Sequence, residues 1–276
     1  MSGLWLIGRS PVCSLREAIA SLDYEKIQVR VKDDIVAHSR LLQEDPAGFL
    51  LWETPQGRYW IPSSSKWAIH WDLAEQARRI YGVGPRAVRS GDVVLDCGAN
   101  VGVYTRVALD AGARLVVAIE PAPENLICLR RTFAAEIAAG RVLLVPKGVW
   151  DKEDILSLKV DRANSAADSF VLDTTGQHDF IKVPLTTIDK LAEELHLDRV
   201  DFIKMDIEGA EQQALTGARS ILARFHPRLA ISAYHKPEDP KGIPVIVHDA
   251  WSGYSMECGY CLTDGRRVIP SVLFFR

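Results

Sequence analysis

From residue 90 onward, short apolar runs alternate with patterns of helical period. Residues 93–95 and 115–119 are unbroken apolar runs, which are typical of strands buried on both faces of a parallel sheet. Further strands are predicted at 141–146, 155–160, 180–183, 200–209 and 229–234. Helices are predicted at about 101–108, 125–139, 186–195, 210–221 and 244–251. This alternation predicts a doubly wound α/β sheet.

The chain ends with two apolar segments, 254–262 and 268–275, on either side of Thr263-Asp-Gly-Arg266. Asp-Gly between two apolar strands is a strong signal for a tight hairpin turn. We therefore expect the sheet to close with an antiparallel hairpin, an ending that is unusual for enzymes with nicotinamide cofactors.

Residues 1–89 lack this alternation. The predicted elements are a helix to about residue 22, strands at 26–31, 49–53 and 58–61, a loop at 63–65 and a helix at 67–81. Ser14 and Glu17 have the spacing of a capping box, and Thr54-Pro-Gln-Gly57 is a hairpin signal. We predict a small α+β extension over residues 1–89 that leans on the main domain, residues 90–276, and covers its site. Its tryptophans, Trp60, Trp67 and Trp71, are interpreted as packing residues.

The charge, hydropathy and cysteine content of the chain limit which classes of partner and which location are expected. The 276 residues carry a net charge of −3 and contain no lysine–arginine run, so no nucleic-acid partner is expected. No apolar stretch has membrane-spanning length, and no signal peptide is evident. The five cysteines are odd in number and scattered, which favours reduced thiols in the cytoplasm. Cys258 and Cys261 have metal-ligand spacing but no second pair, and are interpreted as structural.

A glycine turn follows the first buried strand and precedes a helix. Gly98 comes just after Asp96, where the chain must turn, and Gly102 lets the helix pack close to the strand. Glu120 follows Gly102 by eighteen positions, at the end of the next apolar run, where an acid can accept hydrogen bonds from both hydroxyls of a ribose. Together these features predict an adenosine-bearing cofactor. The alternative is that Gly98 only turns the chain and that Glu120 caps a strand in solvent.

Polar side chains gather where the predicted strands end. Asp96, Glu120, Asp206 with Glu208, and His235 all occupy such positions. Because the carboxyl ends of parallel strands meet at one edge of a sheet, we expect four acids and a histidine at one rim. The polar stretch 161–178 is expected to form a mobile loop over the site. Alternatively, Asp206 or Glu208 caps the next helix, and His235 has a structural role.

Four segments resemble the FkbM family of S-adenosylmethionine (SAM)-dependent methyltransferases. They are Asp96-Cys-Gly-Ala-Asn-Val-Gly102, Ile119-Glu-Pro-Ala-Pro-Glu-Asn125, Val183-Pro-Leu-Thr-Thr-Ile-Asp189 and Lys204-Met-Asp-Ile-Glu-Gly-Ala-Glu211. Tyr234-His-Lys-Pro-Glu-Asp239 is similar to a segment that some members carry after the fifth strand. The resemblance covers residue 90 to the C-terminus. It implies the Rossmann-like class I methyltransferase fold, with its C-terminal antiparallel hairpin, and methyl transfer, most often to a hydroxyl of a sugar or secondary metabolite.

The resemblance also assigns residues to the cofactor. Asp96, Gly98, Asn100 and Gly102 would surround the methionine part of SAM, Glu120 would hold the ribose, and Gly148 or Val149 would lie beside the adenine. Ala99, Tyr104, Pro121 and Asp206 complete the expected cofactor-binding set. Asn100 replaces the second glycine of a G-x-G-x-x-G fingerprint, where a pyrophosphate needs bare backbone. SAM has no pyrophosphate, so this departure favours a methyl donor over NAD.

Methyl transfer to a hydroxyl requires a base, because the acceptor proton leaves as the new bond forms. His235 is the first candidate, since a neutral imidazole titrates near physiological pH. Asp206 is the second, and it could instead position the amino group of the cofactor; Glu208 completes the expected catalytic group. A divalent metal held by Asp206, Glu208 and His235 is an alternative use of the same residues.

Two other functions stay open on the sequence alone. A nicotinamide oxidoreductase is disfavoured by the incomplete glycine fingerprint and by the absence of a tyrosine followed four positions later by lysine. A catalytically inactive SAM-binding module is disfavoured by the intact set of polar residues at the strand ends. No phosphate-binding P-loop, G-x-S-x-G or H-E-x-x-H motif occurs. The expected partner is a small-molecule acceptor, and no oligomeric state is predicted.

Overall fold

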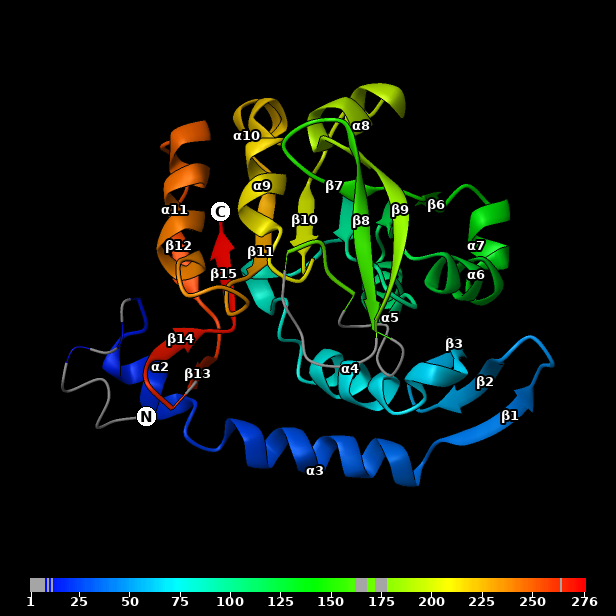
Figure 1. Ribbon diagram of the computed structural model, residues 1–276. Helices are drawn as coiled ribbons and strands as arrows, with labels where there is room; N and C mark the ends of the chain where they lie inside the picture. Colours follow the sequence, from blue (N-terminus) through cyan, green and yellow to red (C-terminus); the bar gives the residue numbers. More distant parts are fainter. Residues whose placement is uncertain (1–7, 9, 11, 162–167, 172–177, 264) are drawn as a thin grey trace.

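The computed structural model describes all residues except 1–7, 9, 11, 162–167, 172–177 and 264. At its centre is a seven-stranded sheet of order β12-β15-β11-β10-β4-β5-β6 (Figure 1). The parallel strands are β4 (Val93–Cys97), β5 (Leu115–Ile119), β6 (Val142–Val145), β10 (Phe202–Met205) and β11 (Arg228–Ser232). Two antiparallel strands, β15 (Val272–Phe275) and β12 (Met256–Cys258), complete one edge. The predicted doubly wound sheet with an antiparallel ending is confirmed.

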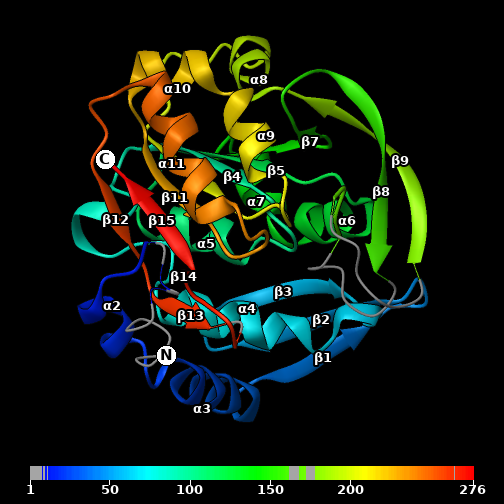
Figure 2. The ribbon, with the colours of Figure 1, turned by 60° about the vertical axis from the view of Figure 1, so that its left-hand side comes forward.

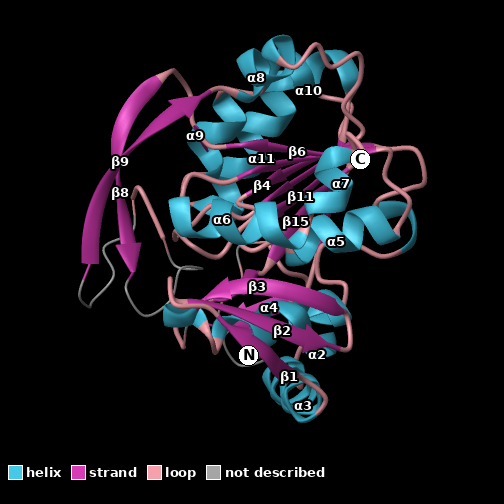
Figure 3. Ribbon diagram, turned by 90° about the vertical axis from the view of Figure 1, so that its right-hand side faces the viewer, coloured by secondary structure: helices cyan, strands magenta, loops and turns pink. Residues whose placement is uncertain are grey.

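Helices cover both faces of this sheet (Figure 3). One face carries α8 (Ile188–Glu194), α9 (Glu211–Thr216), α10 (Arg219–Phe225) and α11 (Asp239–Ala250), and the other carries α5 (Val103–Asp110), α6 (Pro123–Thr132) and α7 (Ala134–Ala138). Within β4, Leu95 packs toward the first group and Val94 toward the second, because side chains alternate along a strand. All five residues of β4 are buried, which explains the unbroken apolar run in the sequence.

The N-terminal third forms a small α+β unit that lies against the sheet at the carboxyl ends of its strands (Figures 1 and 2). Its elements are α2 (Leu15–Ala20), α3 (Tyr24–Ala37), β1 (Arg40–Glu44), β2 (Phe49–Thr54), β3 (Gly57–Pro62), η1 (Ser63–Ser65), α4 (Ala68–Ala77) and η2 (Gly84–Arg86). The capping box of Ser14 and Glu17 and the β2–β3 hairpin are as predicted. Its apolar core is continuous with the main domain through Val103 and Cys128.

The structure differs from the prediction in several elements. Residues 26–31 belong to helix α3 and not to a strand, because Tyr24, Gln28 and Ile35 share one buried helical face. Strand β1 was not predicted, and 63–65 form a turn of 3-10 helix. The predicted helix at 125–139 is two helices, α6 and α7, which are separated at Phe133, where the backbone leaves helical geometry and the side chain is fully buried.

A second sheet of order β7-β9-β8 consists of β7 (Gly148–Val149), β8 (Asp154–Asp161) and β9 (His178–Thr186). β8 and β9 form a long antiparallel ribbon at the side of the molecule (Figure 3). Most of the predicted loop at 161–178 lies outside the described residues. The predicted C-terminal hairpin is divided into two parts, since β13 (Cys261–Thr263) pairs with β14 (Val268–Pro270) and β12 pairs with β15; its turn includes residue 264, which is also outside the described part.

Two of the five cysteines are joined. A disulfide connects Cys13 to Cys261, whereas Cys97, Cys128 and Cys258 are free thiols. The expectation of five reduced thiols is therefore wrong for Cys13 and Cys261. The bond also removes Cys261 from any metal site with Cys258.

Candidate active site

Two adjoining cavities open at the carboxyl ends of the central strands. The first is lined by Gly98, Asn100, Ile119, Glu120, Pro121, Lys147, Gly148, Val149, Leu158, Asp168, Phe170, Asp206, Ile207, Glu208 and Ala210. The second, of about 310 Å³, is lined by Asp72, Glu75, Gln76, Tyr81, Gly98, Ala99, Asn100, Val103, Tyr104, Lys204, Asp206, Glu208 and Tyr234. Four residues line both: Gly98, Asn100, Asp206 and Glu208. The second cavity has the size of a small-molecule site, and both lie where the strand order reverses, between β4 and β10.

The glycine turn after β4 brings two strand ends close together. Gly98 has a φ of +77°, and a Cβ at this position would overlap the carbonyl oxygen of Asp206, which follows β10. Backbone N–H groups of Gly98 and Ala99 donate to the carbonyl oxygen of Ile119, so the turn is also fixed to β5. Gly102, with a φ of +92°, precedes α5, and a Cβ there would overlap the ring of Phe133. Both glycines are required for close approach.

Glu120 is buried at the end of β5 and holds the neighbouring loops. One carboxylate oxygen accepts the backbone N–H of Asn100 at 2.8 Å. The other accepts the N–H of Ala122 at 2.9 Å and the side-chain amide of Asn125 at 3.4 Å. A carboxylate has about four lone-pair positions, so these three bonds leave capacity for a ligand hydroxyl. Glu120 lines the first cavity and is not a solvent-exposed cap.

Asp96 has a different environment from the one expected. Its side chain is completely buried and lines neither cavity. It accepts a hydrogen bond from the hydroxyl of Thr105 at 2.7 Å and pairs with the ammonium group of Lys204 at 3.4 Å. Lys204 in turn donates to the carbonyl oxygen of Gly98 at 2.8 Å. Asp96 therefore acts on the glycine turn through Lys204, and direct contact with the methionine part of a cofactor is not supported by its position.

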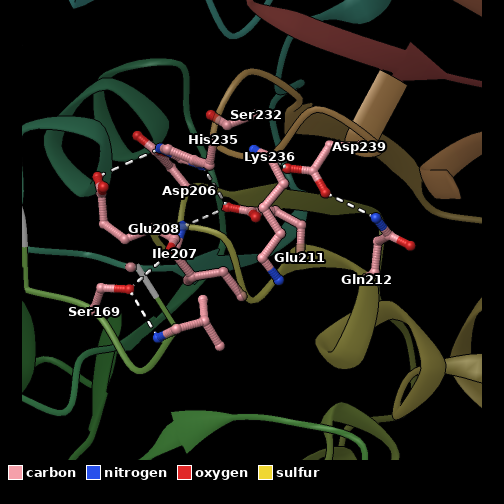
Figure 4. A network of polar contacts seen from close by, with 12 residues as sticks. Ser169, Asp206, Ile207, Glu208, Glu211, Gln212, Ser232, His235, Lys236 and Asp239 are labelled. Carbon is pink, nitrogen blue, oxygen red and sulfur yellow. Dashed lines mark hydrogen bonds and ion pairs between the residues drawn. The ribbon is translucent and has the colours of Figure 1, made fainter. Parts of the chain in front are cut away.

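The ends of β10 and β11 bring together an imidazole and three carboxylates (Figure 4). The Nδ1 atom of His235 lies 3.0 Å from Oε1 of Glu211. Its Nε2 atom lies 3.5 Å from both Asp206 and Glu208. The hydroxyl of Tyr81, from the segment after α4, donates to Oδ2 of Asp206 at 2.6 Å. Of the four acids expected at this rim, Asp206 and Glu208 are neighbours of His235, and Glu211 joins them.

These carboxylates change the protonation of His235. Burial alone would lower the pKa of the imidazole, but its hydrogen bonds and charge interactions with Glu208 and Glu211 raise the pKa well above the ordinary value. An imidazole that is already protonated at neutral pH has no lone pair to accept a proton. These surroundings favour the protonated imidazole, and the role of His235 as a neutral base stays a prediction.

Asp206 is held as an anion, by contrast. Burial raises its pKa, yet the positive charges of Lys204 and His235 and the hydrogen bond from Tyr81 outweigh burial and lower it. A carboxylate with a lowered pKa is a poor proton acceptor and a good partner for a positively charged ligand group.

Comparison with known proteins identifies the fold family. The family profile "Methyltransferase FkbM domain" matches residues 96–261. The chain belongs to the FkbM methyltransferase family. Methyltransferase FkbM from Methylobacillus flagellatus KT is 24% identical, with a TM-score of 0.52 over 76% of this chain and 52% of that one. The chain thus spans about half the length of that relative.

A second solved structure is less similar to this FkbM chain. The putative methyltransferase SMU.1697c from Streptococcus mutans, solved in complex with SAH, is 13% identical; the match covers 74% of this chain and 96% of that one, with a TM-score of 0.44. A search of curated proteins gives no match. Among the described residues, no helix has both the length and the apolar character that crossing a membrane requires.

Most residues expected at the cofactor or in the catalytic group line the cavities of the FkbM fold. Those in the first cavity are Gly98, Asn100, Glu120, Pro121, Gly148, Val149, Asp206 and Glu208; the second adds Ala99 and Tyr104. Asp96, Gly102 and His235 line neither. Gly102 belongs to the turn and lies close to the ring of Phe133. His235 contacts the cavity residues Asp206 and Glu208 without lining a cavity itself.

The sequence interpretation missed the contribution of α4 to the FkbM site. Asp72 and Glu75 line the second cavity, and the side-chain amide of Asn100 donates to Asp72 at 3.3 Å. Burial, with the nearby charge of Asp206, raises the pKa of Asp72 to about 7. Burial, with Asp72 and Asp206, raises the pKa of Glu75 to about 8. Their spacing of three places both on one helical face, but nothing local in the sequence shows that this face meets the strand ends.

Proposed function

We propose that this chain transfers the methyl group of SAM to a hydroxyl of a small-molecule acceptor. The observation that carries the proposal is the pair of adjoining cavities that share Gly98, Asn100 and Asp206. Glu120 lines the first cavity and is proposed to hold the ribose. In the second, carboxylates surround a space for an acceptor. A cofactor that spans both would present its methyl group to the acceptor.

The proposed chemistry is an in-line displacement at the methyl carbon. Carboxylates that only stabilise the sulfonium would favour the ground state over the transition state, in which the positive charge is disappearing. The useful contributions of the protein are therefore alignment and proton removal. Asp206, held as an anion by Lys204 and Tyr81, is proposed to fix the amino group of the methionine part.

Asp72 replaces His235 as the proposed base. It lines the second cavity and is hydrogen-bonded to Asn100, which places it beside the glycine turn. A carboxyl group with a pKa of about 7 is ionised in part of the molecules at neutral pH and is far more basic than an ordinary aspartate, which favours general base catalysis. The hydroxyl as acceptor is supported by the family resemblance together with this base.

We also infer a cytoplasmic location. It is supported by the three free thiols, Cys97, Cys128 and Cys258. The disulfide between Cys13 and Cys261 argues against it, because stable disulfides are rare in reducing compartments.

Calorimetry with SAM, S-adenosylhomocysteine and NADH in parallel tests the cofactor. We expect binding of the first two, weakened about 10- to 100-fold by Glu120→Gln, because hydrogen bonds to a charged group contribute about 1.5–3 kcal/mol. Glu124→Gln, an exposed acid of the same segment, is the matched control and should bind normally. Preferential binding of NADH would overturn the proposal.

A screen of hydroxyl acceptors for release of S-adenosylhomocysteine tests the transfer itself. Turnover should fall at least about 100-fold in Asp72→Asn if that carboxylate is the base. SAM binding without turnover on any sugar or metabolite hydroxyl would instead support an inactive SAM-binding module.

A further inference from the structure

Three side chains beside the second cavity, those of Asp206, Glu211 and His235, share one feature. Each has one polar atom that is hydrogen-bonded within the protein and a second polar atom that makes no hydrogen bond to a described residue. The hydroxyl of Tyr81 donates to Oδ2 of Asp206, whereas Oδ1 of Asp206 has no hydrogen-bond partner in the described part of the chain. Nδ1 of His235 contacts Glu211, whereas its Nε2 atom makes no well-formed hydrogen bond among the described residues and lies 3.5 Å from Asp206 and Glu208.

Glu211 also has one hydrogen-bonded and one unpaired carboxylate oxygen, and its side chain is the most deeply buried of the three. Its Oε1 atom accepts the backbone N–H of Ile207 at 3.0 Å and contacts His235. Its Oε2 atom makes no hydrogen bond to any described residue, although the side chain is 0% exposed. The side chain of His235 is only 4% exposed. Buried polar atoms of this kind normally have a partner, so these unpaired atoms point to a ligand.

These three side chains lie close together. Asp206, Glu211 and His235 can each offer one ligand atom, and these atoms lie within 4.8 Å of one another. Figure 4 shows the three side chains facing a common region between the ends of β10 and β11 and the start of α9. The separation of 3.5 Å between Nε2 of His235 and Asp206 is too long for a good hydrogen bond, but two ligands of one cation commonly lie this far apart.

The charges around this point are unbalanced. Three carboxylates, those of Asp206, Glu208 and Glu211, surround one imidazole, which carries at most one positive charge. The nearby ammonium group of Lys204 pairs with Asp96 and donates to the carbonyl oxygen of Gly98. Buried carboxylates without a compensating charge are strongly unfavourable unless they bind a cation.

We propose that Asp206, Glu211 and His235 bind a divalent cation of the Mg²⁺ or Mn²⁺ type, which would displace any proton from the coordinating nitrogen of His235. Carboxylate oxygens with one imidazole suit these ions, and Glu211 would orient the imidazole through Nδ1, as carboxylates commonly do beside metal-bound histidines. Compared with the ligands expected from the sequence, Glu211 takes the place of Glu208, which contacts His235 but is not a member of this group of three. Binding of the ion does not depend on methyl transfer.

If the proposed function also holds, the cation would lie at the wall of the acceptor cavity, because Asp206 lines it. An acceptor oxygen could then complete the coordination of the ion, and its hydroxyl would become more acidic. This consequence rests on the proposed function; the site itself rests on the three side chains.

The test is a titration of the full chain with MnCl₂, without SAM or acceptor, followed by loss of the electron paramagnetic resonance signal of free Mn²⁺. We expect one Mn²⁺ per chain, with affinity weakened at least about tenfold by Glu211→Gln and by Asp206→Asn. Asp239→Asn is the matched control: Asp239 is a buried acid nearby, held by Gln212 and by the backbone N–H of Lys236, and its removal should leave Mn²⁺ affinity unchanged.

Two results would overturn the site. One is the absence of bound Mn²⁺ up to about 1 mM in wild-type chain, a result that does not depend on the folding of any variant. The other is equal weakening by Glu211→Gln and Asp239→Asn in variants with the circular dichroism spectrum of the wild type. Parallel calorimetry with SAM separates this outcome from a failure of the proposed function, since the chain can bind SAM whether or not it binds the ion.

Discussion

Replacing Gly98 by alanine should damage the fold at the point where β4 and β10 come closest. The left-handed backbone of Gly98, with a φ of +77°, destabilises an alanine by about 1–2 kcal/mol. The new Cβ would also lie 2.9 Å from the carbonyl carbon of Asp206 and closer still to its oxygen. Since these are backbone atoms of a buried strand end, forced displacement adds about 1–3 kcal/mol. We expect a total loss of roughly 2–5 kcal/mol in the free energy of unfolding.

Gly140→Ala separates the two contributions. Gly140 also has a positive φ, +67°, but a Cβ there meets no atom within 4 Å, so only the backbone term of about 1–2 kcal/mol should appear. Both variants are measured by urea unfolding, followed by circular dichroism and tryptophan fluorescence, and by calorimetry with SAM. Gly98→Ala should also lose SAM affinity, whereas Gly140→Ala should keep it. Equal stability losses in the two variants would show that the strand ends are not packed as described.

Two further predictions concern buried charges. Lys204→Met should lower the free energy of unfolding by about 3–5 kcal/mol, because it leaves Asp96 buried without its partner. The control is Lys190→Met, which breaks an exposed pair with Glu153 and should have little effect on urea unfolding. Similar urea midpoints for the two variants would refute the argument. Asp72 has a folded-state pKa of about 7, above its ordinary value, so the unfolded chain ionises first and stability should fall as pH rises from about 4 to 7. Asp72→Asn should reduce this slope in thermal melts across that range, and turnover of the wild type should rise through about pH 7; an unchanged slope would exclude the raised pKa.

The central sheet could be predicted because its strands are buried on both faces. β4 and β5 consist almost entirely of buried residues, so each gives an apolar run that needs no knowledge of its neighbours. Residues 26–31 misled the prediction for the opposite reason. Ile27 and Val29 are apolar but largely exposed, while the polar Gln28 is buried, so the local alternation did not reflect the true buried face.

The candidate site was predictable only as far as the strand ends determine it. Asp206, Glu120 and the glycine turn follow from sequence position, because parallel strands end at one edge. The protonation of His235 depends on Glu208 and Glu211 together, and no spacing rule gives that environment. The contribution of Asp72 depends on how the extension docks against the sheet, which is a tertiary property and not a local one.

The bond between Cys13 and Cys261 joins the N-terminal extension to the C-terminal part of the chain. The disulfide attaches the start of the N-terminal extension to the main domain. The end of the extension is attached by the backbone that continues into β4. Helix α4, which supplies part of the wall of the second cavity, therefore lies in a segment that is attached at both ends and also through the apolar core that it shares with the main domain. Reduction of the bond would release the first of these attachments and leave the other two.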